Sequence, residues 1–314
     1  MNNVFQGIKI AIAAVAAIII SNLLSLEFSV SAGIVAILTI AATKKETIKT
    51  VLERLVAFII AIIIAFICFN LLGYTYLAFY IYLFLYLIIC KYKKWGSAMA
   101  VNSVLVSHFL TVKEMNISTI SNELLLFGIG ALFGVLVNLH LRANNDYLNQ
   151  MYLDINVQVK KILSRMSQRV SNDNLDEYNG TCFTNIKESI EKTKQKVELN
   201  YMNSFSKKRN DFEYINLKEQ EVHILYNIYK KLKNINVNLI TTECVSNYIN
   251  YLSENYDKDD LIDEVIKEFY LLKEEIRNSV LPENRTEFEE RAKLYIVLEY
   301  LEELLLLKKE FIIN

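Results

Sequence analysis

The chain has 314 residues, of which 53% are hydrophobic and 22% are charged, and its formal net charge is −1. The charge is unevenly spread: residues 1–142 hold ten Lys/Arg and five Asp/Glu, a net of +5, whereas residues 143–314 hold 24 and 30, a net of −6. An apolar, mildly basic first part and a charge-dense, acidic second part indicate two different solvent environments. The acidic second part argues against a nucleic-acid partner.

Six apolar segments follow one another in the first part, and each is predicted to be a membrane-crossing helix. In chain order they are residues 8–26, 28–43, 55–72, 76–90, 97–112 and 124–141. Several are shorter than the ~20 residues of a full crossing, which a small bundle or a locally thinned bilayer accommodates. Residues 1–142 are therefore expected to form a transmembrane domain of about six helices.

Basic residues gather in alternate loops between these segments. One set of loops carries Lys44, Lys45, Lys49, Arg54, Lys91, Lys93, Lys94 and Arg142, and the other set carries Lys113. The positive-inside rule then predicts a multi-pass protein of the cell membrane with both termini in the cytoplasm. Six of these residues could also form a cytoplasmic rim that concentrates anions at the mouth of a pathway: Lys44, Lys45, Lys91, Lys93, Lys94 and Arg142. Both interpretations fit the pattern.

None of the six segments contains Asp or Glu, and the only proline, Pro282, lies in the second part. Carriers that are driven by protons or sodium usually place a carboxylate at membrane depth, and many transporter sites use proline-broken helices. The sequence therefore argues against a carboxylate-driven cation antiporter.

The fifth segment has a polar face. At 100° per residue, Ser103, Ser107, His108 and Thr111 fall within one arc. They could line a substrate pathway with His108 as its titratable group, or they could serve helix packing and bond to their own backbone.

The fourth segment is rich in aromatic residues, and Phe79, Tyr82 and Tyr86 share a face. An aromatic wall could stack on a planar substrate ring, although packing is the favoured interpretation.

The sixth segment carries Gly130, Gly134 and Asn138 at intervals of four residues, and the first carries Ala13, Ala17 and Ser21 in the same way. Such stripes of small residues allow another helix to approach closely. The contact could lie within one bundle or between two copies of the chain.

Residues 143–314 read as helices throughout, with apolar stripes over 186–201, 222–232, 261–276 and 294–305. Pro282 and the capping box Thr286-x-x-Glu289 predict the start of the last helix. The fold class is thus all-α: a six-span transmembrane helical bundle followed by a soluble cytoplasmic helical bundle at residues 143–314.

Motifs of catalysis and cofactor binding are missing from the sequence. It has no Gly-rich nucleotide loop, no HExxH and no nucleophile elbow, and the four cysteines have no zinc spacing. We therefore expect a protein that is not an enzyme and that holds no cofactor and no metal.

The order of the segments and the run GIGALFGVLVNLHLRANND, Gly128–Asp146, resemble the aromatic acid exporter family of the fusaric-acid-resistance-like superfamily. The acidic tail resembles the C-terminal domain of its Gram-positive-type members. The resemblance implies efflux of small aromatic carboxylates and a distant kinship with plant malate channels. Larger relatives carry two membrane units in one chain, which implies a homodimer here.

Two functions remain in competition. The first is a transporter in the lipid bilayer that exports small organic anions. The second is a non-transporting scaffold or sensor whose acidic tail binds a protein partner. A polar face inside the spans would favour the first, whereas an apolar, sealed bundle would favour the second.

Overall fold

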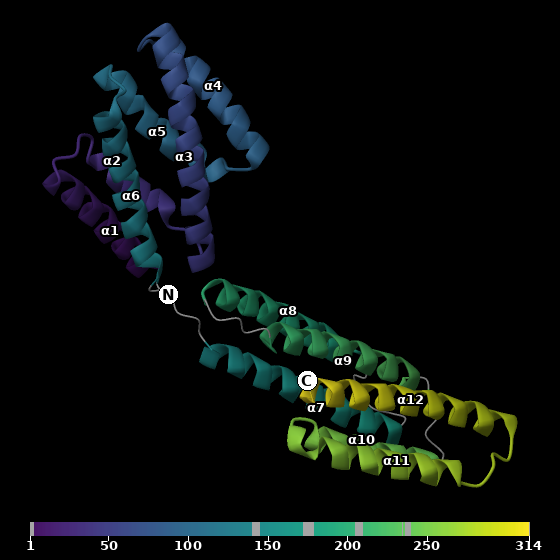
Figure 1. Cartoon of the computed structure of the whole chain (residues 1–314). Coiled ribbons are helices and arrows are strands. Elements are labelled where there is room, and N and C mark those ends of the chain that lie inside the picture. Colours follow the sequence, from purple (N-terminus) through teal and green to yellow (C-terminus); the bar gives the residue numbers. More distant parts are fainter. Residues whose placement is uncertain are drawn as a thin grey trace. The chain divides into compact units, whose positions relative to one another are not determined.

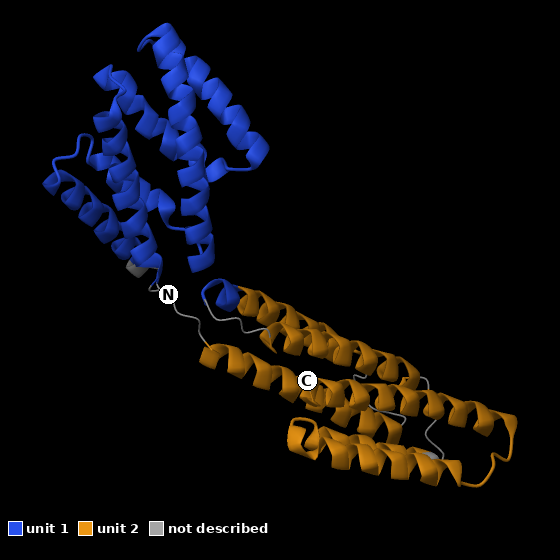
Figure 2. Ribbon diagram, in the orientation of Figure 1, with its two compact units in different colours: residues 1–143, 199–206 blue, residues 144–198, 207–314 orange. Residues whose placement is uncertain are grey.

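A computed structural model describes residues 3–139, 145–171, 179–204, 210–233, 235 and 240–313. The described residues form twelve α-helices, one 3₁₀ turn and no strand, so the all-α prediction is confirmed (Figure 1). They divide into two compact units, which Figure 2 shows in separate colours. Unit 1 comprises residues 1–143 and 199–206, and unit 2 comprises residues 144–198 and 207–314.

Unit 1 is a bundle of six helices that run in alternating directions (Figure 1). They are α1 (Asn3–Leu23), α2 (Val30–Thr39), α3 (Lys44–Leu72), α4 (Tyr76–Lys93), α5 (Gly96–Val112) and α6 (Ile117–Leu139). By length and composition, α3, α4 and α6 are able to cross a membrane, while α2, α5 and the apolar stretch Gly7–Leu23 of α1 are shorter. Three spans are therefore supported, and the count of six stays a prediction.

The second predicted span is broken in the structure. Helix α2 ends at Thr39, and α3 begins at Lys44 rather than at the expected residue 55. The Thr43 hydroxyl accepts a hydrogen bond from the backbone N–H of Glu46 at 3.3 Å, which caps α3. The basic segment before the apolar run is thus the first part of a long helix and not a loop.

The side chain of Asn138 in α6 forms hydrogen bonds to the residues between α2 and α3 and to the first turn of α3. Its Nδ2 donates to the backbone carbonyl of Ala41 at 2.8 Å and also bonds to the Thr47 hydroxyl. Buried backbone outside a helix needs other hydrogen-bond partners, and Asn138 supplies one to the carbonyl of Ala41.

The sixth predicted span also begins earlier than expected. Helix α6 starts at Ile117 and not at residue 124, so Glu123 lies inside the helix, where it is 2% exposed. The predicted segment 124–141 contains no carboxylate, but the helix that carries it does, which weakens the argument against a carboxylate-dependent carrier. A span predicted from hydropathy stops at the first charged residue, here Glu123. The helix itself continues past that residue to Ile117.

Both stripes of small residues are used inside unit 1. A Cβ added at Gly130 would lie 2.5 Å from the carbonyl oxygen of Ala32, and one added at Gly134 would lie 2.9 Å from that of Ala36. Helix α6 therefore packs closely against α2. The stripe of Ala13, Ala17 and Ser21 on α1 is likewise buried. Neither stripe is free to join two copies of the chain.

The outward faces of unit 1 are apolar. Large exposed side chains follow α3 and α4, among them Ile59, Ile63, Phe66, Tyr80, Phe84 and Ile88. Its interior instead holds many alanines, such as Ala57, Ala61 and Ala65 of α3, each with no exposed surface. Apolar outside and small inside is the arrangement expected of helices packed in lipid.

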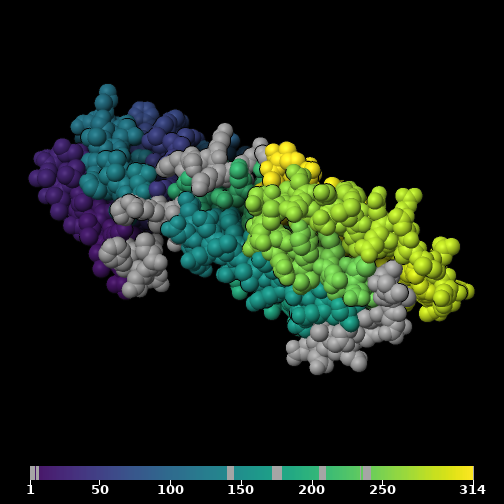
Figure 3. Space-filling model, turned by 90° about the horizontal axis from the view of Figure 1, so that it is seen from below, coloured from purple at the N-terminus to yellow at the C-terminus, as the bar shows by residue number. Residues whose placement is uncertain are grey.

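Unit 2 is an antiparallel helical bundle with a core of large apolar side chains. Its helices are α7 (Asn145–Ser171), α8 (Thr181–Met202), α9 (Asn210–Leu232), α10 (Ile240–Asn255), α11 (Ile262–Arg277) and α12 (Arg285–Ile313), with the 3₁₀ turn η1 (Asp259–Leu261) before α11. Helix α7 packs against α10, and the space-filling view shows teal α7 beside the green α10–α11 region (Figure 3).

The start of α12 differs from the predicted capping box. The Asn284 side chain accepts from the backbone N–H of Glu287, and the Glu287 carboxylate accepts from the N–H of Glu283, each at 2.9 Å. Asn caps helices as well as Thr does, and it too is followed by Glu three residues later. The cap is therefore Asn284 and not Thr286.

Candidate functional site

A buried arginine lies in the interior of unit 1. Arg54 of α3 is 4% exposed, and its Nη1 donates to the Thr39 hydroxyl, at the C-terminal end of α2, over 3.4 Å. Its Nε has no hydrogen-bond partner. Among the residues that the structure describes, no carboxylate forms an ion pair with this guanidinium. A buried cation without a counter-charge is costly in protein and in lipid.

Asn102 of α5 completes the surroundings of Arg54. It is fully buried, and its Nδ2 donates to the backbone carbonyl of Arg54 at 3.1 Å and to the Tyr86 hydroxyl at 2.9 Å. The Tyr86 hydroxyl in turn donates to the carbonyl of Ala98. The Oδ1 of Asn102 has no partner. We call Arg54, Thr39, Asn102 and Tyr86 the Arg54 cluster.

This cluster has the chemistry of an anion site. A guanidinium presents N–H donors in a planar fork that matches a carboxylate, and an Arg is the usual residue for such recognition. Burial strengthens each of these interactions because water does not compete for them.

A second polar cluster lies near the other end of α5. His108 Nδ1 lies 2.8 Å from Oε2 of Glu123 in α6, and His108 Nε2 lies 3.2 Å from the Ser31 hydroxyl in α2. As a whole residue, His108 is 8% exposed, and its ring stacks on Phe28 with 4.1 Å between the ring centroids. His108 and Glu123 line a cleft of about 510 Å³.

The hydroxyls of the predicted pathway face do not join His108 in this cleft. Ser103 Oγ donates to the carbonyl of Met99, Ser107 Oγ to that of Val104, and Thr111 Oγ1 to that of Ser107. Each hydroxyl thus bonds to its own helix, as Ser and Thr often do. A pathway role for these three residues stays a prediction.

Tyr82 and Tyr86 both point into unit 1 and have no exposed surface. Their rings stack, with 5.7 Å between the centroids and 11° between the planes. They are core side chains, and Tyr86 is also the aromatic member of the Arg54 cluster.

The lysines of the predicted basic rim lie at two different distances along the helices of unit 1. Lys44 and Lys45 begin α3, whereas Lys91 and Lys93 end α4 and Lys94 follows it. Helix α3 ends and α4 starts at the same turn, residues 73–75, and α3 has 29 residues against 18 in α4, so α3 extends about 16 Å further from that turn at ~1.5 Å per residue. The remaining member, Arg142, lies outside the described residues.

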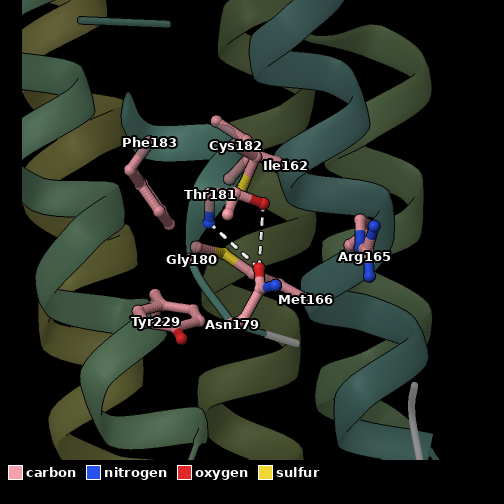
Figure 4. Close-up of a pocket in the computed structure, with 9 residues that line it drawn as sticks. All are labelled: Ile162, Arg165, Met166, Asn179, Gly180, Thr181, Cys182, Phe183 and Tyr229. Carbon is pink, nitrogen blue, oxygen red and sulfur yellow. Dashed lines mark hydrogen bonds between the residues drawn. The ribbon is translucent and has the colours of Figure 1, made fainter. Parts of the chain in front are cut away.

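Unit 2 has a small pocket between α7, the start of α8 and α9. Figure 4 shows Phe183 and Tyr229 on one side of it and Arg165 on the other, with Asn179 accepting hydrogen bonds from the N–H and hydroxyl of Thr181. Its volume of about 20 Å³ holds little more than one water molecule. It is too small for an organic anion.

Sequence reasoning missed Arg54, Asn102 and Glu123. A signal for two of them was present: Arg54 immediately precedes the predicted span 55–72, and Glu123 immediately precedes 124–141. When a helix-capping residue lies several positions before a charged residue, that charged residue and the apolar run after it belong to the same helix. Thr43, which caps α3 ahead of Arg54, is an example. The role of Asn102 depends on contacts between helices, which no local pattern contains.

Comparisons with known proteins cover the whole chain. Residues 1–141 match the family described as aromatic acid exporter family member 1, and residues 145–309 match the candidate aromatic acid exporter C-terminal domain. The uncharacterized protein YqjA of Bacillus subtilis (strain 168) is 24% identical over 308 residues, which are 98% of this chain and 95% of that protein.

A crystal structure of a candidate membrane protein from Clostridium difficile 630 is 19% identical, with a TM-score of 0.49, and covers 53% of this chain and 99% of its own. The exporter family and the three long apolar helices indicate a membrane protein. With both matches taken together, the chain belongs to the aromatic acid exporter family.

Proposed function

We propose that this protein exports small organic carboxylates, aromatic ones in particular, across the cell membrane. Family membership supports transport as such. The observation that carries the proposal is Arg54, a guanidinium that is 4% exposed and has no carboxylate partner among the described residues. In this proposal the missing counter-charge is the substrate, which binds Arg54 through its carboxylate.

The competing scaffold hypothesis predicts an apolar, sealed interior. Unit 1 instead buries Arg54, Asn102, His108 and Glu123, of which each is at most 8% exposed. Such groups are expensive at membrane depth and usually mark a substrate or ion pathway. This supports transport over a scaffold.

The stacked rings of Tyr82 and Tyr86 support an aromatic substrate. Tyr86 bonds to Asn102, so its ring adjoins the anion site. An aromatic ring of the substrate could stack there while its carboxylate meets the guanidinium. Because Arg54 is buried, an anion reaches it only when the surrounding helices separate.

Efflux is the expected direction. An inside-negative potential favours expulsion of an anion by about 2.3 kcal/mol per charge per 100 mV. The rim lysines Lys44, Lys45, Lys91 and Lys93 would raise the local anion concentration on the cytoplasmic side.

The test is efflux of radiolabelled benzoate from liposomes that contain the purified full chain. Arg54→Gln should reduce the flux at least about tenfold, which is the loss expected when one charge-assisted contact of ~1.5 kcal/mol or more is removed. Lys49→Gln is the matched control, because Lys49 lies on the same helix but its side chain is 75% exposed and pairs with Glu53. Equal flux in wild type, Arg54→Gln and empty liposomes would refute the proposal.

The topology that we propose has six crossings and both termini in the cytoplasm. The alternating helices of unit 1 and the loop charges support it. In a variant without native cysteines, a cysteine at Thr75 should react with an impermeant reagent from outside intact cells, and one at Lys93 should not. The reverse result would invert the model.

A homodimer is the assembly that the family resemblance implies. Since the Gly130/Gly134 and Ala13/Ala17 stripes are buried in unit 1, such a dimer would use the apolar outward faces instead. Light scattering in detergent measures the assembly directly.

A further inference from the structure

His108 and Glu123 form a buried pair that the anion site does not use. Their side chains are 11% and 3% exposed, and Oε1 of Glu123 also accepts from Asn122 Nδ2 at 3.1 Å. The pair is nevertheless within reach of water because both residues line the cleft between the α1–α2 turn, α5 and α6. A buried His–carboxylate pair with access to water is a site that can take up and release a proton.

Few other ionisable groups surround this pair. Helix α2 has none, His108 is the only one in α5, and Glu123 is the only one in α6. Glu27 of the α1–α2 turn lines the same cleft, and Lys113 and Glu114 follow α5 as exposed residues. The charge at the centre of the cleft is therefore set by His108 and Glu123.

The pair and the Arg54 cluster share two helices. Helix α2 carries Ser31, which bonds to His108, and Thr39, which bonds to Arg54. Helix α5 carries His108 and also Asn102, which bonds to the Arg54 carbonyl. Asn102 and His108 are six residues apart, about 9 Å along a helix. Two shared helices thus connect the sites, and a charge at one site also acts on the other through the electric field.

We infer that the His108–Glu123 pair is a proton-binding site that is linked to the anion site at Arg54, an inference that rests on the proposed function. Without the proton, His108 Nδ1–H donates to Glu123 and Nε2 accepts from the Ser31 hydroxyl. The added proton goes to Nε2, so Ser31 must turn from donor to acceptor. The pair then changes from a net charge of −1 to neutral.

The sign of the linkage follows from this charge. A bound anion favours the neutral pair over the negative one, so protonation should tighten anion binding. Two unit charges ~10–15 Å apart in a medium of effective dielectric constant ~20 give a factor of about ten. By reciprocity, anion binding should draw in a proton.

The experiment measures the dissociation constant of radiolabelled benzoate for the full chain in lipid nanodiscs between pH 8 and pH 5. Benzenesulfonate, which stays charged over this range, separates titration of the protein from titration of the ligand. Wild type should bind both anions about tenfold more tightly at pH 5 than at pH 8. Glu123→Gln and His108→Gln should each bind with little dependence on pH.

Glu114→Gln is the matched control, because it removes an exposed carboxylate at the same end of unit 1 and should keep the wild-type profile. Because both Glu123→Gln and His108→Gln are measured, the test still holds if one of these two variants fails to fold. Anion binding without pH dependence in wild type, or with unchanged pH dependence in both variants, would overturn the inference and leave the anion site standing. If neither anion binds at any pH, the anion site and the inference both fail.

Discussion

The two units differ in the mix of side chains that they bury. Unit 1 buries many alanines and glycines beside larger residues such as Phe58 and Tyr82 and exposes many large apolar side chains, whereas unit 2 fills its core with residues such as Phe269, Leu301 and Ile228, each with no exposed surface. In water, burial of large apolar groups drives folding. In lipid that force is absent, and close contact between small residues holds helices together. One chain thus shows both solutions to helix packing.

The units also treat buried charge differently. In unit 2, Lys218 is 2% exposed, and its ammonium lies 2.7 Å from a carboxylate oxygen of Glu221 and 2.7 Å from the Tyr256 hydroxyl. Burial lowers the pKa of Lys218, and the nearby Glu221 carboxylate opposes that shift. In unit 1, the guanidinium of Arg54 has no such carboxylate among the described residues. The first arrangement neutralises a buried charge within the protein, and under the proposed function the second leaves that task to a ligand.

The largest expected effect tests this contrast in buried charge. Lys218→Met leaves the Glu221 carboxylate buried without its cation, and it should cost about 3–5 kcal/mol of folding free energy. Arg54→Met removes a charge that has no counter-charge, so it should leave unit 1 as stable or more stable. Thermal unfolding and hydrogen exchange of α3 and α9 in the full chain measure both.

The double variant Lys218→Met/Glu221→Gln is the control for this result. With the carboxylate replaced by an amide, no unpaired charge remains, and most of the lost stability should return. Equal losses from Lys218→Met and Arg54→Met would show that the two units bury charge in the same way.

A smaller effect tests the contrast in packing. Gly130→Ala adds a Cβ that would lie 2.5 Å from the Ala32 carbonyl oxygen and 2.6 Å from Val35 Cβ. Helix α2 must then move, at a cost of about 1–3 kcal/mol. Gly128→Ala, two residues earlier, meets nothing within 4 Å and should be neutral or stabilising. The apparent melting temperature in detergent compares them, and equal values would refute close packing of α6 on α2.

The smallest effect concerns the water-facing surface of unit 2, where Glu302 of α12 joins α11. Hydrogen bonds from Lys273 and from Tyr270 lower the pKa of Glu302. A carboxyl whose pKa is lower in the folded state adds stability above its unfolded pKa of ~4.3 and loses it as the pH falls through the folded value. Glu302→Gln should therefore cost up to about 1 kcal/mol at pH 7, and this cost should shrink as the pH falls through the folded pKa.

The control for Glu302 is Glu289→Gln. Its partner Arg285 is 91% exposed, so that pair should contribute nothing measurable at either pH. Unfolding of the full chain is followed by hydrogen exchange in α11 and α12. A pH-independent difference between wild type and Glu302→Gln would refute the ion-pair explanation.

The order of the membrane helices was predictable because long apolar runs persist whatever packs against them. Residues 76–90 and 97–112, for instance, lie within α4 and α5 almost from end to end. Helix ends were less predictable. Two overlapping capping boxes, at Asn284 and Thr286, compete at the start of α12, and only the contacts decide between them.

The candidate site was less predictable than the fold. His108 was singled out as the titratable group of its helix, but its partner Glu123 fell just outside a predicted span. The pairing depends on α5 and α6 lying side by side, which periodicity does not encode. Arg54 was counted among loop charges because hydropathy treats a cation as the end of a span.

Helix α5 begins directly after Trp95, which is half-buried and is the only tryptophan in the sequence. Intrinsic tryptophan fluorescence of the whole protein therefore originates at one end of the helix that carries both Asn102 and His108. The emission wavelength of an indole depends on its exposure to water. A tilt of α5 that changes the exposure of Trp95 would consequently be detectable in the unmodified protein, with no attached dye, as a shift in the wavelength of its emission maximum.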